Sequence, residues 1–275
     1  MRTIYKCFPG GKFKVLTMSY DDGRDGDRKL VSIFDKYGIR GTFNLNAGLI
    51  DRYEPQIQDK FGGRVKREEF RELYKNHEVA CHTLTHPTIE RCPLTEVVKQ
   101  IMEDRQELEN IMGYPVRGLA YPNGSYTEDI KKLLPNIGIE YSRIVGSSDN
   151  FGSPKDFFEW KATCHHGHNL LKHADEFLAL NKKQYLYMFY VWGHSFEFDR
   201  DDSWGLIEEF CAKMGNNDDI WYATNIEIVD YFKLWDNLKF SADGTFVYNP
   251  SAKSAWVSVD GKIYEVKGGT QVKFE

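Results

Sequence analysis

Short apolar runs alternate with segments of helical periodicity along most of this chain of 275 residues. Strand-like runs are expected at residues 14–20, 42–46, 78–81, 117–121, 139–144, 185–191 and 220–223. Helices are expected at residues 27–37, 67–75, 94–112, 127–134, 203–214 and 226–235. Strands that alternate with helices form parallel sheets, because each helix returns the chain to the start of the next strand. The number of such units favours a closed or nearly closed α/β barrel over an open sheet.

Two segments carry this pattern most clearly. Residues 185–191 form an unbroken apolar run between loops, as expected for a strand that is buried on both faces. Residues 94–112 repeat apolar side chains at helical spacing, with Pro93 before the first turn. Gly113 follows them and can adopt the left-handed conformation that commonly ends a helix.

The pattern changes after residue 237. Short β-rich runs then alternate with the turn pairs Asp243-Gly244, Asp260-Gly261 and Gly268-Gly269. We therefore expect a barrel domain at residues 1–237 and a small β-rich module at residues 238–275. A module of this size needs to pack on the main domain to be stable.

The charge balance and hydropathy exclude some partners. A net charge of −5 offers no basic surface for nucleic acid or for an anionic membrane. The longest apolar run, residues 185–192, is less than half of a membrane span. Residues 1–14 lack the apolar stretch of a signal peptide, so a cytoplasmic protein is expected. The five cysteines form no C-x-x-C pair and are expected to be free thiols, and the oligomeric state is left open.

Three polar clusters lie where predicted strands end. The first is the pair Asp21 and Asp22, directly after the first strand-like run. The second is His82 and His86, four residues apart, and the third is His194, which follows the apolar run at 185–191. The carboxyl ends of the strands of a parallel barrel share one face, so these side chains are expected to converge.

Each cluster suggests part of a metal site. Two imidazoles four residues apart can bind one ion, and an aspartate completes the three protein ligands of an open catalytic site. Adjacent carboxylates raise each other's pKa unless a cation separates their roles, so one aspartate can bind metal while the other accepts a proton. A histidine at the end of a barrel strand is well placed as a general acid. Taken singly, the clusters also fit a solvated turn and structural histidines.

In this order the clusters resemble the motifs of the polysaccharide deacetylase family, the NodB-like deacetylases. The first family motif, an Asp-Asp pair before glycine, is matched by residues 19–23 (SYDDG). The second, His-Ser/Thr-x-x-His, is matched by residues 82–86 (HTLTH), and the last, a histidine after an apolar strand, by His194. The resemblance covers roughly residues 12–230 and implies a distorted (β/α)7–8 barrel of the NodB type, followed here by the small β module.

The resemblance also implies a role for each residue. Asp21 would be the general base and His194 the general acid. Asp22, His82 and His86 would bind a divalent metal, for which zinc is expected first and cobalt, manganese or nickel are alternatives.

Two family motifs are altered or not identifiable. The third normally begins with an arginine that orients the base, but Ala120 stands there, in residues 120–124 (AYPNG). We predict that Arg143, at the end of the next strand-like run, takes its place. The fourth normally supplies an aspartate that orients the acid and a nearby tryptophan, and three residues stay open for this motif: Asp149, Asp156 and Trp160. His165 and His166 are interpreted as exposed loop histidines.

The predicted substrate is an N- or O-acetylated carbohydrate, contacted by Tyr121, Asn123 and Trp192. One alternative keeps the fold and the metal site but hydrolyses a different amide, in a small cytoplasmic metabolite. A non-catalytic sugar-binding module is disfavoured because both aspartates and all three histidines are present. Non-haem iron oxygenases also use two histidines and one carboxylate, but normally on a β-barrel and with a His-x-Asp spacing, whereas here the acid, Asp22, lies sixty residues upstream of His82.

Overall fold

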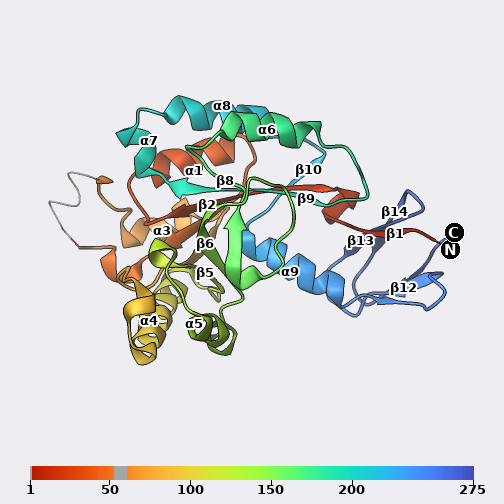
Figure 1. Cartoon of the computed structure of the whole chain (residues 1–275), viewed down its shortest axis with the longest axis horizontal. Helices are drawn as coiled ribbons and strands as arrows, with labels where there is room; N and C mark the ends of the chain where they lie inside the picture. Colours follow the sequence, from red (N-terminus) through yellow and green to blue (C-terminus); the bar gives the residue numbers. More distant parts are fainter. Residues whose placement is uncertain (1, 53–60) are drawn as a thin grey trace.

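The computed structural model describes residues 2–52 and 61–275 (Figure 1). Within them, one sheet contains nine strands, and every strand pair in it is parallel. The strands are β2 (Lys14–Asp21), β3 (Gly41–Leu45), β4 (Glu78–Cys81), β5 (Gly118–Ala120), β6 (Tyr141–Ser147), β7 (Trp160–Ala162), β8 (Cys164–His165), β9 (Tyr187–His194) and β10 (Ile220–Tyr222). The predicted parallel α/β architecture is therefore confirmed.

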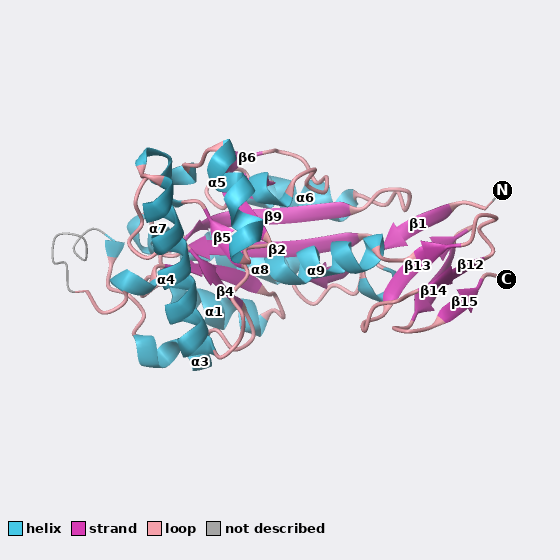
Figure 2. Ribbon diagram, turned by 90° about the horizontal axis from the view of Figure 1, so that it is seen from below, coloured by secondary structure: helices cyan, strands magenta, loops and turns pink. Residues whose placement is uncertain are grey.

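Helices cover the outside of this sheet, as Figures 1 and 2 show. They are α1 (Asp27–Lys36), α3 (Phe70–Leu73), α4 (Leu94–Met112), α5 (Glu128–Leu133), α6 (Leu170–Ala179), α7 (Phe196–Arg200), α8 (Trp204–Met214) and α9 (Asn225–Asp236). The helix expected at 67–75 is shorter, because residues 67–69 form a 3₁₀ turn before α3. The long helix α4 ends as predicted, with Gly113 in the left-handed region at φ 79°.

The sheet returns on itself through the segment 160–165. Its hydrogen-bonded order runs β7-β6-β5-β4-β3-β2-β9-β8, with β10 also paired to β2. The two end strands, β7 and β8, are separated in the chain only by Thr163. The Thr163 N–H donates to the Tyr190 carbonyl on β9, whereas its own carbonyl accepts from the Asp149 N–H, just after β6. One segment therefore joins both ends of the sheet, which gives the distorted barrel that was predicted.

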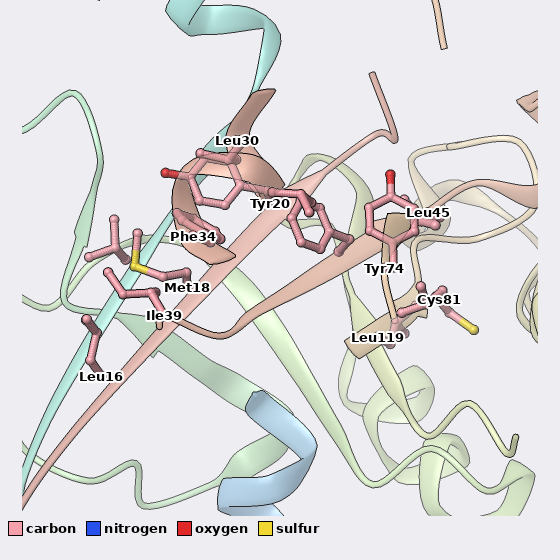
Figure 3. Close-up of a cluster of buried hydrophobic side chains, with 14 of the residues drawn as sticks. Leu16, Met18, Tyr20, Leu30, Phe34, Ile39, Leu45, Tyr74, Cys81 and Leu119 are labelled. Carbon is pink, nitrogen blue, oxygen red and sulfur yellow. The ribbon is translucent and has the colours of Figure 1, made fainter. Parts of the chain in front are cut away.

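The side chains of β2 alternate between the apolar outside of the barrel and its polar interior. Leu16, Met18 and Tyr20 face outward and pack against Leu30 and Phe34 of α1 (Figure 3). The intervening side chains of β2 face the opposite way, because successive residues of a strand point to opposite faces. They change from apolar to charged along the strand: Val15, Thr17, Ser19 and Asp21. The same alternation on the other strands turns Asn44, Arg143 and His194 inward.

The remaining strands form two small sheets beside the barrel. One has the order β1 (Ile4–Cys7), β13 (Ala255–Val259) and β14 (Lys262–Val266). The other has the order β11 (Lys239–Phe240), β12 (Phe246–Tyr248) and β15 (Gln271–Lys273). Helix α9 connects them to the barrel, since the Tyr231 hydroxyl donates to the Cys7 carbonyl at 2.6 Å and the Trp235 indole to the Trp256 carbonyl at 3.1 Å. The first strand, β1, thus pairs with C-terminal strands rather than with the barrel, and the division at residue 237 stays a prediction.

Candidate active site

A pocket of about 550 Å³ opens at the carboxyl ends of the barrel strands. Its lining includes all five residues of the three polar clusters: Asp21, Asp22, His82, His86 and His194. The register of the sheet explains part of this convergence, because His194 of β9 and Asn44 of β3 are both paired with Asp21 of β2. Three neighbouring strands therefore present their side chains at the same level of the barrel.

Asp22, His82 and His86 form a group with the composition of a metal site. Asp22 Oδ1 lies 3.9 Å from the Nε2 atom of each histidine. The Nδ1 atom of His82 lies 2.8 Å from the Ala120 carbonyl, so Nδ1 carries the proton and Nε2 keeps its lone pair. Burial also lowers the pKa of His82 to about 4, which keeps this imidazole neutral. Two imidazoles and one carboxylate fit a zinc-type ion with an open position.

The backbone around these three residues is held in uncommon conformations. Asp22 and His86 have φ values of 79° and 59°, in the left-handed region that side chains rarely adopt. The buried carboxylate of Asp104, on α4, accepts hydrogen bonds from the backbone N–H of Ala47 at 2.7 Å and of His82 at 3.0 Å. Such conformations persist only where surrounding contacts fix them.

Asp21 is buried, and two polar side chains donate hydrogen bonds to its carboxylate. Asn44 Nδ2 donates to its Oδ1 at 2.8 Å, and Arg143 Nη2 donates to its Oδ2. Burial opposes ionisation of Asp21, but the charges of Arg143, His82 and His194 and the bond from Asn44 outweigh it and lower the pKa. The carboxylate is therefore ionised and fixed, as a general base requires. Arg143 is paired in register with Ala120, which is why it reaches the region of the missing motif arginine.

His194 lies beside Asp21 and Glu197. Its Nε2 atom lies 3.9 Å from Asp21 Oδ2, and its Nδ1 atom lies 3.4 Å from Glu197 Oε2. Burial disfavours the charged imidazolium, yet Glu197, Asp21 and Asp22 outweigh it and raise the pKa of His194. Sequence reasoning missed Glu197, which follows His194 by three residues on α7.

The three residues left open for orienting His194 lie elsewhere. Asp149 Oδ1 lies 3.4 Å from His173 Nε2. Asp156 accepts from the Phe158 N–H and pairs with Lys131, and the ring of Trp160 packs on Tyr141 and Tyr190. The interpretation of His165 and His166 as exposed loop residues is also wrong. Both contact Glu197, and His166 is buried.

The three residues predicted to contact the substrate differ in their exposure and in the contacts that they already make. Tyr121, Asn123 and Trp192 all line the pocket. The Tyr121 hydroxyl, however, donates to the Phe158 carbonyl at 3.1 Å, so it is already engaged. Asn123 is exposed at the pocket edge, whereas the indole of Trp192 lies 4.5 Å from the Arg143 guanidinium and only 9% of the residue is exposed.

Comparison with known proteins points to one family. Residues 9–142 match the family model described as polysaccharide deacetylase. The chain is 25% identical over 144 residues to a chitooligosaccharide deacetylase of Sinorhizobium fredii, covering 50% of this chain and 60% of that protein. It is 23% identical over 123 residues to the peptidoglycan-N-acetylmuramic acid deacetylase PdaC of Bacillus subtilis, covering 44% of this chain and 24% of that protein. The chain thus spans three-fifths or less of these two relatives.

Solved structures agree on the fold. A putative polysaccharide deacetylase from Mycobacterium smegmatis aligns with a TM-score of 0.60 at 16% identity, covering 83% of this chain and 93% of that one. The Xyl-CE4 domain of a multidomain xylanase from the hindgut metagenome of Trinervitermes trinervoides aligns with a TM-score of 0.53 at 13% identity, over 80% and 92% of the two chains. Within the residues described here, no helix is both long and apolar enough to cross a bilayer.

Proposed function

Residues 9–142 of this chain belong to the polysaccharide deacetylase family, and from that premise we propose that the protein is a metal-dependent hydrolase that removes acetyl groups from an acetylated carbohydrate. The observation that supports this most is the meeting of Asp21, Asp22, His82, His86 and His194 in one pocket, from strands that lie far apart in the sequence. In this proposal Asp22, His82 and His86 bind a divalent ion, with zinc favoured by the ligand set.

The bound ion would lower the pKa of water and polarise the acetyl carbonyl. Asp21 accepts a proton from the water while the water oxygen attacks the carbonyl carbon. Asn44 and Arg143 hold both carboxylate oxygens of Asp21, so the base is aligned before the substrate arrives. Since the pKa of Asp21 is lowered, the carboxylate is available at neutral pH.

The second half of the reaction needs an acid. Collapse of the tetrahedral species breaks the bond between the acetyl carbon and the sugar nitrogen or oxygen and releases acetate. An amine or alkoxide is a poor leaving group, so His194 donates its Nε2 proton to it. His194 Nε2 lies 3.9 Å from Asp21 Oδ2, so the base that accepts a proton and the acid that donates one lie side by side.

The test is acetate release from N-acetyl hexosamine oligomers, acetylated xylan and small amides. We expect release from at least one acetylated sugar, its loss with a chelator, and its recovery when zinc, cobalt, manganese or nickel is restored. Asp22→Asn should lose both metal and activity. Asp236→Asn is a matched control, because that aspartate is exposed and pairs with Lys6 on the surface. Turnover of the small amides alone would refute the carbohydrate assignment in favour of a metabolite amidohydrolase.

A further inference from the structure

The carboxylate of Glu197 is the centre of a cluster of three histidines beside the pocket. Its Oε2 atom lies 2.9 Å from His165 Nε2, 3.4 Å from His166 Nε2 and 3.4 Å from His194 Nδ1. The backbone N–H of His194 also donates to Oε2 at 3.2 Å. Glu197 is only 9% exposed, so these groups, together with Arg200 at 3.5 Å from Oε1, form most of its surroundings.

We infer that Glu197 is a positioning residue, which holds His194 with its proton-bearing Nδ1 toward the carboxylate and its Nε2 toward Asp21 and the substrate. This inference rests on the proposed function, in which His194 is the general acid. Nδ1 of His194 is buried and makes no hydrogen bond to the described residues, and Glu197 Oε2, 3.4 Å away, is an acceptor within reach of it. A catalytic contact of 3.4 Å commonly shortens when substrate binds.

The tautomer of His165 supports a hydrogen-bonded role for the cluster. The Gly167 N–H donates to His165 Nδ1 at 3.1 Å, so Nδ1 must be unprotonated and Nε2 must carry the proton. That Nε2–H then donates to Glu197. Burial would raise the pKa of Glu197, but the bonds from His165 and His194 outweigh it and lower the pKa. Glu197 is therefore an anion, as an orienting carboxylate must be.

His166 completes the enclosure of the carboxylate. Its ring is stacked on Tyr20 at 5.7 Å and on Phe198 at 4.2 Å between centroids. Burial lowers the pKa of His166 to about 3, so the ring is neutral. The ring fits against β9 because residue 193 is glycine: a Cβ there would lie 2.0 Å from His166 Nδ1.

A second metal site is the competing interpretation, because His165, His166 and Glu197 also have the composition of a ligand set. The hydrogen bond from Gly167 argues against it. Binding of an ion to Nε2 of His165 would move the proton to Nδ1, where it would face the Gly167 N–H, and two donors cannot satisfy each other. The two interpretations differ in metal content: one ion per chain for the positioning role, two for the second site.

The decisive comparison is Glu197→Gln on two substrates. Protonation by His194 is needed to release a sugar amine or alkoxide, but p-nitrophenolate leaves without a proton. We expect kcat for the acetylated sugar to fall about 10-fold or more. A general acid typically contributes about 10²- to 10⁴-fold in rate, and the variant should lose part of that contribution. Hydrolysis of p-nitrophenyl acetate, KM and metal content should stay within about twofold of wild type. Glu197→Asp should recover part of the loss, and Glu209→Gln, at an exposed position of α8, serves as the control.

Equal losses on both substrates would show that Glu197 only supports the fold, and unchanged kcat on the sugar would also overturn the inference. Two bound ions per wild-type chain would favour the metal site instead. A wild-type protein that releases no acetate would contradict the proposed function, not this placement. In that case ¹⁵N–¹H correlation spectra of the imidazoles still decide: wild type should show His194 protonated at Nδ1, and Glu197→Gln should lose that preference. A wild-type His194 protonated only at Nε2 would refute the inference.

Discussion

Replacing Arg143 by methionine tests how the buried base is held. Methionine keeps most of the length of the side chain but removes the charge, so the effect is electrostatic rather than a large cavity. Arg143 and Asp21 have side chains that are only 1% and 3% exposed, so the ion pair is largely shielded from water. We expect Arg143→Met to destabilise the protein and to slow turnover at the same time.

The magnitude follows from the other contacts of Asp21. Breaking a buried ion pair by removing one partner typically costs about 3–5 kcal/mol, because an unpaired charge stays buried. Asn44 still donates to Oδ1 in the variant, which argues for the lower end, about 3 kcal/mol. If the unpaired carboxylate is the cause, the double variant Asp21→Asn/Arg143→Met should recover about 2 kcal/mol of that loss. A base that is free to move should lower kcat by about 10².

The free energy of unfolding is measured by urea denaturation with a chelator present, so that metal binding does not contribute. Turnover is measured separately on metal-loaded protein of known metal content. A single variant as stable and as active as wild type would show that Arg143 does not hold Asp21. A double variant no more stable than Arg143→Met would show that the loss comes from packing instead.

Four further substitutions test other residues in and around the site. Asp21→Asn should keep metal content near wild type while abolishing turnover, whereas Asp22→Asn should lose metal; equal metal loss in both, by elemental analysis, would contradict the division of roles. Burial raises the pKa of Asp27 to about 7, so between about pH 4 and 7 the folded protein keeps a proton that the unfolded chain has released, and the free energy of unfolding falls by up to about 1.4 kcal/mol per pH unit as pH rises. Asp27→Asn should remove this slope from a pH series of urea unfolding, and an unchanged slope would mean other groups cause it. Gly193→Ala should displace the ring of His166, giving a lower melting temperature, and a melting temperature equal to wild type would show that the ring has room to move.

The parallel fold and the convergence of the polar clusters could be predicted because in a parallel barrel the position of a residue along its strand determines the face on which it lies. Polar residues at the ends of parallel strands meet on one face, and this applies directly to Asp21, His82 and His194. Arg143 could be proposed because it lies at the level of Ala120 on the adjacent strand. These are properties of strand order and register, which a periodic sequence carries.

Features that depend on tertiary packing were missed. The strands β7 and β8 have only three and two residues, which is too short to show an alternating pattern. They pair with different neighbours, β7 with β6 and β8 with β9. His166 was taken as exposed because its burial depends on a glycine nearly thirty positions away. The contacts of Glu197 depend on the positions of His165 and His194 on adjacent strands, which the sequence pattern does not show. A search for carboxylates within one turn of a predicted acid would have found it.

The pairing of β1 with β13 has a consequence for the order of folding. Ile4 is paired in register with Val259, almost the whole length of the chain away. During synthesis the parallel barrel can assemble from neighbouring segments, but β1 waits without a partner until the last strands emerge. An unpaired strand edge is a template for association with other chains. A fragment cut after α9 would leave that edge permanently open, so a shortened chain meant to keep the barrel should lose β1 together with the C-terminal strands.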